Sequence, residues 1–316
     1  MLPVMERFLI HVLRKIIQAS VLRQSAKFRN MKKATLVIQF FLIILPGYAQ
    51  SLHVGVFGGL SAYEGDLQEK IFPKKVTNGA IGFTANYELT ERIFVRGGFN
   101  YSVLAGSDQY ADDSSLIRRN LSFETSLAEF SLVGEYYVFN LYDQKFSPYV
   151  FGGVGIFHFN PYAYDVSKNR VFLQPLSTEG QGLPQYPDRK PYSLTQFMLP
   201  FGAGIKYAFS DNVRLGLELD MRKTFTDYLD DVSTSYPDIT DLFQAKGATA
   251  VDFSYRGDEI PGGDPNFPAK NSQRGGAEHN DWYYFIGLHL TFRLGATNNG
   301  NFMSNKKKYG CPTVPQ

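Results

Sequence analysis

Apolar and polar residues alternate without a break over residues 213–222, V-R-L-G-L-E-L-D-M-R. A period of two is typical of a β-strand, with the leucines on one face and the glycine and charged residues on the other. A strand of a soluble sheet normally buries its apolar face against a core. A strand of a membrane barrel turns an aliphatic face to lipid and a polar face to the lumen, and this segment favours the membrane barrel.

The same alternation recurs along the chain and predicts eight strands. In the last of them, residues 282–294, Trp282 and Ile286 oppose His289 and Arg293. The fifth segment contains so many Gly and Phe residues that its faces cannot be assigned from the pattern. The predicted strands span residues 52–63, 79–89, 92–103, 126–141, 148–160, 196–209, 213–222 and 282–294.

The connections between the predicted strands alternate in length. Barrels of the bacterial outer membrane have an even number of strands, short periplasmic turns, long outer loops and no open edge in lipid. We therefore expect an all-β fold, an eight-stranded antiparallel transmembrane β-barrel with long extracellular loops. It would lie in the outer membrane of a Gram-negative bacterium with both termini in the periplasm. The short turns lie at residues 90–91, 141–146 and 210–212, and the long connections at 64–78, 104–120, 161–194 and 226–280.

A soluble eight-stranded barrel of the lipocalin kind is the alternative fold. Such a barrel needs an apolar inward face. Here charged residues lie opposite the smoother aliphatic face, so the soluble barrel is the less favoured interpretation.

An export signal of the Sec type is predicted at residues 31–49. Two lysines follow Met31, an apolar stretch covers residues 34–45, and Ala49 is the small residue before the cleavage point. The stretch is too short for a stable membrane helix. Residues 1–30 are basic and loosely amphipathic, and we interpret them as the product of a start codon assigned too early. An extended targeting region or an interfacial helix is the alternative. The expected organisation is an upstream segment (1–30), the signal peptide (31–49), the barrel (50–295) and a periplasmic tail (296–316).

Composition supports an exported β protein and excludes several functions. Aromatic residues make up 15% of the chain, nearly all of them Tyr and Phe, and 29 residues are Gly, which fits a chain of many strands. The net charge of +2 argues against nucleic acid as a partner. The single cysteine, Cys311, excludes a disulfide framework and a thiolate zinc site. We predict no cofactor and no metal, and outer-membrane lipid around the barrel.

Ten charged residues are predicted to face the lumen, five of each sign. The interior of an eight-stranded barrel is just wide enough to be filled by side chains. Buried charges at this density must pair, so we expect a salt-bridged lumen instead of the single-sign ring of a selective channel. The predicted lumen charges are Glu88, Glu129, Glu135, Glu218 and Asp220 with Arg96, Lys206, Arg214, Arg222 and Arg293.

One local cluster, Ser272, His279 and Asp281, could serve an enzyme. Some membrane barrels are hydrolases or acyltransferases with such residues near the outer rim, but a triad is recognised by geometry, and solvated loop residues are the favoured interpretation. The three aspartates of T-D-Y-L-D-D-V (residues 226–232) could collect calcium, but they lack the spacing of a known ion loop. A solvated or turn-capping role is favoured for them. We therefore predict no catalytic residue and no small-molecule substrate.

Five stretches of the chain are distinctive. They are G-G-L-S-A-Y-E-G-D-L (58–67), S-P-Y-V-F-G-G-V-G-I-F-H-F-N-P (147–161), T-E-G-Q-G-L (178–183), R-K-T-F-T-D-Y-L-D-D-V-S (222–233) and K-K-K-Y-G-C-P (306–312). Together they resemble the PorG-like outer-membrane β-barrel family associated with the type IX secretion system. The resemblance runs over almost the whole mature chain, and residues 1–30 have no counterpart in it. It implies a monomeric barrel that attaches to the periplasmic ring of the secretion machine, and it carries over no catalytic residue.

The tail after the last predicted strand is a candidate contact for a partner. A basic run can steer an acidic partner into place, and an unpaired cysteine in an oxidising compartment suggests an intermolecular disulfide or a reactive thiol. A disordered terminus is the alternative. The candidate contact residues are Lys306, Lys307, Lys308, Tyr309 and Cys311.

From these features we predict a non-enzymatic docking or assembly component of a type IX secretion apparatus. Its partners would be periplasmic or lipoprotein components of the secretion ring. One alternative is a generic small barrel for envelope stability, or for adhesion through its long loops. A barrel enzyme that acts on lipid or peptide is the less favoured alternative.

Overall fold

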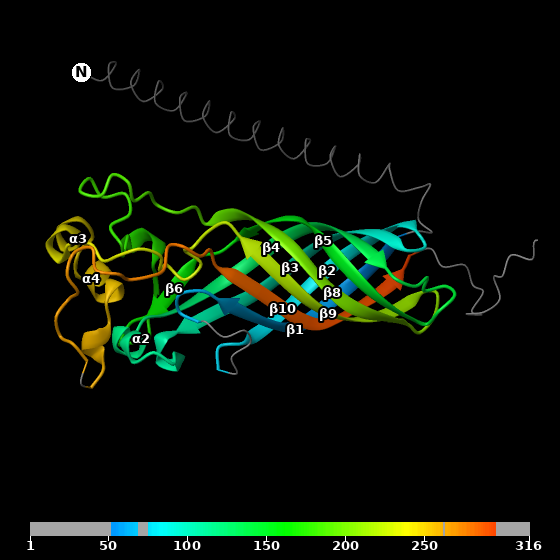
Figure 1. The fold of residues 1–316 in the computed structure, drawn as a ribbon, viewed down its shortest axis with the longest axis horizontal. Coiled ribbons are helices and arrows are strands. Elements are labelled where there is room, and N and C mark those ends of the chain that lie inside the picture. The colour runs from blue at the N-terminus through cyan, green and yellow to red at the C-terminus, as the bar shows by residue number, and fades with distance from the viewer. Residues whose placement is uncertain (1–51, 69–74, 262, 295–316) are drawn as a thin grey trace, which may run out of the picture. The chain divides into compact units, whose positions relative to one another are not determined.

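The computed structural model describes residues 52–68, 75–261 and 263–294. Eight long strands pair antiparallel in sequence order, and β1 pairs with β10, so the sheet closes into a barrel (Figure 1). This confirms the predicted all-β, eight-stranded antiparallel barrel. The barrel strands are β1 (Leu52–Glu64), β2 (Asn78–Thr90), β3 (Ile93–Ser107), β4 (Ser122–Tyr137), β5 (Phe146–His158), β8 (Thr195–Ala208), β9 (Val213–Thr224) and β10 (Trp282–Arg293).

The largest error in the predicted strand boundaries concerns β4, which begins and ends four residues earlier than expected. Residues 122–125 pair with residues 104–107 at the end of β3. At its other end the strand gives way to a turn, in which the Phe139 amide donates to the Ser147 hydroxyl at 2.9 Å and the Tyr142 amide donates to the Asn140 side chain at 2.9 Å. Side-chain acceptors on β5 and in the turn therefore replace the ladder that the apolar pattern suggested.

The outer face of the barrel is apolar. Phe130, Val154 and Leu217 are 60%, 58% and 52% exposed, and large apolar side chains of every barrel strand stand outward in the same way. On β5, whose faces the sequence left open, Val150 points outward and Tyr149 inward. An exposed apolar surface this extensive contradicts the soluble lipocalin-like alternative, because soluble monomers expose only small apolar patches.

Short turns join the strands at one end of the barrel and long connections join them at the other (Figure 1). The predicted alternation of connection lengths is therefore confirmed. No helix among the described residues is long and apolar enough to cross a membrane. The long connections contain short elements that the sequence pattern did not predict. These elements are η2 (Asp108–Tyr110), α2 (Ser114–Arg119), β6 (Pro161–Tyr164), β7 (Arg170–Phe172), η3 (Gln174–Leu176), α3 (Ile239–Lys246), α4 (Ala248–Ser254) and η4 (Gly257–Glu259).

Together these connections fold into one structure over the end of the barrel (Figure 1), which we call the cap (described residues 65–68, 75–77, 108–121, 159–194, 225–261 and 263–281). The longest helix, α3, has a local signal at each end: the Asp238 side chain accepts from the Thr240 amide at 2.8 Å before α3, and α3 ends at Gly247, whose φ is 84°. Residues from all four long connections share a buried apolar core that continues into the adjoining end of the lumen. The cap is thus packed as an extension of the barrel.

Candidate functional site

Four charged residues in the middle of the lumen form one connected group. Arg96 of β3 donates through Nη1 to both carboxylate oxygens of Glu218 on β9, each at 2.8 Å. The Nε of Arg96 lies 3.0 Å from Glu135 on β4, and Lys206 of β8 lies 3.9 Å from the same carboxylate. All four side chains are buried. Because a buried ion without a partner is costly, these contacts are what make the charges tolerable there.

One histidine and two tyrosines complete this central group. The Nδ1 atom of His289 lies 2.7 Å from Glu218, and the Tyr149 hydroxyl donates to the same carboxylate. Tyr137 donates to Glu135 at 2.7 Å. The strand pattern predicts His289 in the lumen but indicates no role for these tyrosines, because in a strand pattern a tyrosine counts only as an aromatic position.

A second ionic group lies nearer the cap. Arg222 of β9 donates to Glu129 of β4 at 2.9 Å, and its other terminal nitrogen lies 3.0 Å from Asp220. Tyr283 and Asn100 each donate to Glu129 at 2.7 Å. Glu129 is thereby held by a charged donor and two neutral ones.

The other three predicted lumen residues gather around Tyr142 at the short-turn end. Tyr142 donates to Glu88 at 2.6 Å, and the guanidinium groups of Arg214 and Arg293 lie 5.0 and 5.6 Å from the centre of its ring. Within the described ranges Arg214 has no carboxylate at ion-pair distance, so an aromatic face takes the place of the expected salt bridge. The ten residues therefore form two ionic groups and one cation–π group, where the sequence predicted one balanced network.

Side chains fill the space between the two ionic groups. A void of about 10 Å³ lies beside Arg96, Asn100 and Asp220. A space of this size holds about one water molecule. The middle of the lumen is therefore packed like a protein interior.

A separate ionic cluster lies inside the cap, around Glu179. This carboxylate accepts from the Ser233 amide at 2.9 Å, from the Thr234 hydroxyl at 2.6 Å and from Arg274 at 3.1 Å. Arg274 also lies 3.7 Å from Asp231. Glu179, Arg274 and Asp231 are all buried, so the connections before β8 and before β10 are joined by charges without access to water.

Three of the stretches that carry the family resemblance meet in the cap. Thr178 of T-E-G-Q-G-L donates to Asp231 of R-K-T-F-T-D-Y-L-D-D-V-S at 2.5 Å. The Tyr63 hydroxyl, in G-G-L-S-A-Y-E-G-D-L, lies 2.6 Å from Asp230 and 3.0 Å from Asp281. The most distinctive residues of the sequence thus make contacts that hold the long connections together.

The prediction that the three aspartates after β9 are solvated is wrong. Asp227, Asp230 and Asp231 are 9%, 1% and 0% exposed, because the other long connections pack over them. Turn capping does hold for Asp230, whose side chain accepts from the Val232 amide at 2.9 Å. No group of three or more His, Cys, Asp or Glu side chains in the described parts of the chain is arranged to hold a metal ion.

Burial changes the protonation of these acids. Loss of hydration raises the pKa of Asp227 to about 7. It raises the pKa of Asp231 to about 6, against the opposing charge of Arg274. Loss of hydration and the charges of neighbouring acids raise the pKa values of Asp230 and Asp281 well above their usual range. The folded cap therefore retains protons near neutral pH that the unfolded chain would release.

We expect the cap to lose stability as the pH rises from about 4 to about 7. A carboxyl with a raised pKa binds more protons in the folded state, so its stabilising contribution is complete below the pKa of the unfolded chain. It is lost as the pH rises through the folded pKa values, about 6 for Asp231 and about 7 for Asp227. Urea titrations of the cap at several pH values, followed by near-ultraviolet circular dichroism of its buried tyrosines, measure this trend.

The control for this prediction is Asp227→Asn, which keeps the shape of the side chain and removes its titration. This variant should show a flatter dependence of cap stability on pH. A stability that rises over the same interval in the unmodified protein would contradict the assignment.

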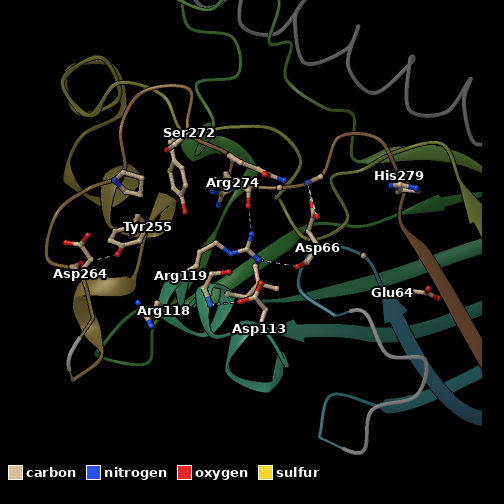
Figure 2. A pocket seen from close by; sticks show the side chains of 18 of the residues that line it. Glu64, Asp66, Asp113, Arg118, Arg119, Tyr255, Asp264, Ser272, Arg274 and His279 are labelled. Atoms are coloured by element: carbon tan, nitrogen blue, oxygen red, sulfur yellow. Dashed lines mark hydrogen bonds between the residues drawn. The ribbon is translucent and has the colours of Figure 1, made fainter.

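An open pocket of about 900 Å³ lies on the cap, between α2 and the connection that leads into β10 (Figure 2). Arg119 lies in its wall and donates to both carboxylate oxygens of Asp108, at 2.8 and 2.7 Å. It also donates to the Asp66 carbonyl at 3.1 Å and to the Arg274 carbonyl. Arg119 thus ties three long connections together behind the pocket.

The cluster considered for catalysis is not assembled at this pocket. Figure 2 shows Ser272 and His279 on different sides of it. The Ser272 hydroxyl donates to the Ala269 carbonyl at 2.6 Å, and Asp281 is buried, where it accepts from the Leu229 amide at 2.8 Å. Within the described residues no hydrogen bond links the three side chains, so they lack the geometry of a triad.

The other sequence-based candidates lie outside the described residues. They comprise the upstream segment, the signal peptide and the candidate partner contact at Lys306, Lys307, Lys308, Tyr309 and Cys311. They stay predictions.

Comparison with known proteins gives one family and several similar folds. A family model described as a domain of unknown function (DUF6089) matches residues 32–246. No curated protein matches the chain. Neisserial surface protein A is similar with a TM-score of 0.38 and 10% identity, over 77% of this chain and 97% of that one. A major outer membrane protein of Thermus thermophilus has a TM-score of 0.36 and 13% identity, over 77% of this chain and 100% of that one. The outer membrane protein OprG from Pseudomonas aeruginosa has a TM-score of 0.33 and 10% identity, over 78% of this chain and 98% of that one.

Proposed function

The chain belongs to the DUF6089 family, and we propose that it is a small, non-conducting β-barrel of the bacterial outer membrane that presents a prefolded cap at the cell surface. The observation that carries this proposal is the cap, in which four long connections share one buried core. Ordering that many loop residues costs conformational entropy, and separate flexible loops would avoid this cost. A rigid cap suits recognition, or support of the envelope, at one fixed surface, and we propose no catalytic role.

The apolar outer face and the packed lumen support the rest of this proposal. The exposed belt of Phe, Leu and Val side chains suits contact with lipid. In outer-membrane barrels the long connections lie outside and the short turns in the periplasm, which would place the cap outside the cell. In the lumen, Arg96 and Arg222 occupy the path that a solute would need, each held by a carboxylate.

We expect the purified protein to form no stable ion channel in planar bilayers. Conduction requires a continuous wet path, and the middle of this lumen has a void of only about 10 Å³. Replacing Arg96 and Arg222 together with alanine should open space and raise the leak current above that of the unmodified protein. Large, stable single-channel currents from the unmodified protein would overturn the proposal of a sealed barrel.

Docking in a type IX secretion apparatus is a second candidate, favoured by the resemblance of five stretches to the PorG-like family. In this proposal periplasmic or lipoprotein components of the secretion ring bind the barrel from the periplasmic side. The candidate contact is the tail, with Lys306, Lys307, Lys308, Tyr309 and Cys311. A basic run beside an aromatic residue and the chain's only cysteine suits an acidic partner or an intermolecular disulfide.

If the tail carries docking, deletion of residues 302–316 should leave membrane insertion intact and abolish co-purification with the ring. Cys311→Ser should remove any higher-mass band on a non-reducing gel. Heat-modifiable gel mobility of the truncated protein reports that the barrel still folds. Full recovery of the partner by the truncated protein would move the proposed contact to the short turns.

A further inference from the structure

We propose that the pocket on the cap binds a short oligosaccharide. The inference deepens the proposed function and rests on it, because the pocket would then face the outside of the cell. The pocket has a volume of about 900 Å³ and is bordered by α2, by the end of β1 and by the connection that leads into β10 (Figure 2). This volume is within the range of small-molecule sites.

Polar groups without partners converge on the pocket. A guanidinium has five N–H donors, and the contacts of Arg119 use four of them, which leaves one without a partner among the described residues. Tyr236 is 3% exposed and lines the pocket, yet its hydroxyl makes no hydrogen bond within the described ranges. Arg118 on α2 is exposed at the rim, with no ion pair in the described part of the chain. A hydroxylated ligand in the pocket would supply partners for these groups.

The carboxylates of the lining are largely occupied by the protein itself. Asp113 accepts from the Ser115 amide at 2.7 Å, and Asp66 accepts from the Gly276 amide at 2.9 Å. The charges of Arg119 and Arg274 are likewise balanced by buried carboxylates. The cations of the lining are therefore largely balanced while its carboxylates keep their charge, which disfavours an anionic ligand such as a polyphosphate, and the free donors suit neutral hydroxyls.

Aromatic side chains form one wall of the pocket. Tyr255 is half-buried, and its ring packs edge-on against that of Tyr236 at a centroid distance of 6.1 Å. The Tyr255 hydroxyl is fixed by donation to the Asp264 carbonyl at 3.0 Å. A rigid aromatic face bordered by planar hydrogen-bonding groups matches a sugar ring, which has an apolar C–H face and a rim of hydroxyls.

A peptide fits this pocket less well than a sugar. Extended peptides commonly bind by adding a strand to an open sheet edge. The residues of named strands in the lining, Glu64 and Trp282, already pair with each other in the barrel. The pocket therefore offers side-chain donors in place of a strand edge.

The experiment uses the full chain folded in detergent and saturation-transfer NMR. The probes are maltohexaose, a hyaluronan hexamer, polysaccharide released by mild acid from the producing bacterium's own lipopolysaccharide, and mucin O-glycans. We expect at least one carbohydrate to bind, and the last two probes distinguish a self-derived source from an external one. Arg118→Ala and Tyr236→Phe should each weaken that binding about tenfold, the effect of losing one well-placed hydrogen bond.

Arg92→Ala is the matched control, because Arg92 is exposed in a short turn at the other end of the barrel, and it should leave binding unchanged. Heat-modifiable mobility verifies that each variant is folded. Absence of binding to all four probes at millimolar concentration would overturn the inference, as would binding that is equal in all variants. Displacement of the signal by a random hexapeptide pool at lower concentration would assign the pocket to peptides instead. If the pocket binds no carbohydrate while the barrel still does not conduct, this inference fails and the proposed function stands.

Discussion

Replacing Arg274 with alanine should destabilise the cap by about 3–5 kcal/mol, the usual cost of removing one partner from a buried ion pair. Arg274 is 3% exposed, donates to Glu179 at 3.1 Å and lies 3.7 Å from Asp231. Its loss leaves two buried carboxylates without a cation. It also removes donors to the Asp231 and Ser254 carbonyls, which hold together distant parts of the connection into β10.

Native-state hydrogen exchange of cap and barrel amides measures this effect separately in the two regions. Cap amides should exchange faster at neutral pH, whereas amides in the middle of the barrel strands should keep their protection. The excess exchange should shrink at acid pH, where Asp231, whose pKa burial raises to about 6, can bind a proton and no longer requires a cation.

Lys270→Ala is the matched control for this prediction. Lys270 pairs with Asp241 in the same part of the fold, at 3.6 Å, but the lysine side chain is 46% exposed. An exposed pair contributes only about 0–1 kcal/mol, so this variant should be nearly silent. Equal effects of the two variants would show that the Glu179 cluster does not hold the cap.

The barrel could be predicted from the sequence because each strand lies between two different environments, one on each face. On β9, lipid outside and packed polar groups inside demand opposite chemistry at every second residue, which leaves a strict period in the sequence. The same period placed Arg96, Glu218 and Arg222 on the inner face, where the structure has them. Alternation gives the face of a side chain but not its partner. It could not show that Arg214 lies over aromatic rings instead of beside a carboxylate.

The cap was missed because its order depends on contacts between distant residues. Its helices are short, and α2 covers only six residues, too few for a helical period to be visible. Aspartates in a loop suggest turns or solvent, and nothing near Asp230 in the sequence indicates that Tyr63 will cover it. The length of the connections was the available signal, because long structureless loops are uncommon in compact domains.

Leu217→Arg should destabilise the barrel by about 2–4 kcal/mol, the cost of an arginine on the lipid face near the middle of the membrane. Leu217 is 52% exposed and lies between Ile205 of β8 and Leu288 of β10, whose side chains face outward with it. Refolding titrations in urea with lipid bilayers measure the change in free energy. Leu217→Phe keeps the position apolar and should cost far less, and a harmless Leu217→Arg would mean that this face does not contact lipid.

Glu218→Gln, one residue further along β9, tests the opposite face of the same strand. The sequence predicts that this change costs less than Leu217→Arg, unless the lumen partner of Glu218 is left unpaired. In the structure Glu218 accepts from Arg96 and Tyr149 and lies 2.7 Å from His289, so removal of its charge leaves a buried guanidinium undercompensated. We therefore expect a cost comparable to that of Leu217→Arg.

The dependence of the two costs on the bilayer should distinguish Leu217→Arg from Glu218→Gln. The cost of the lipid-facing arginine should change with bilayer thickness, because it depends on depth in the membrane. The cost of the lumen variant should stay constant, because side chains shield Glu218 from lipid.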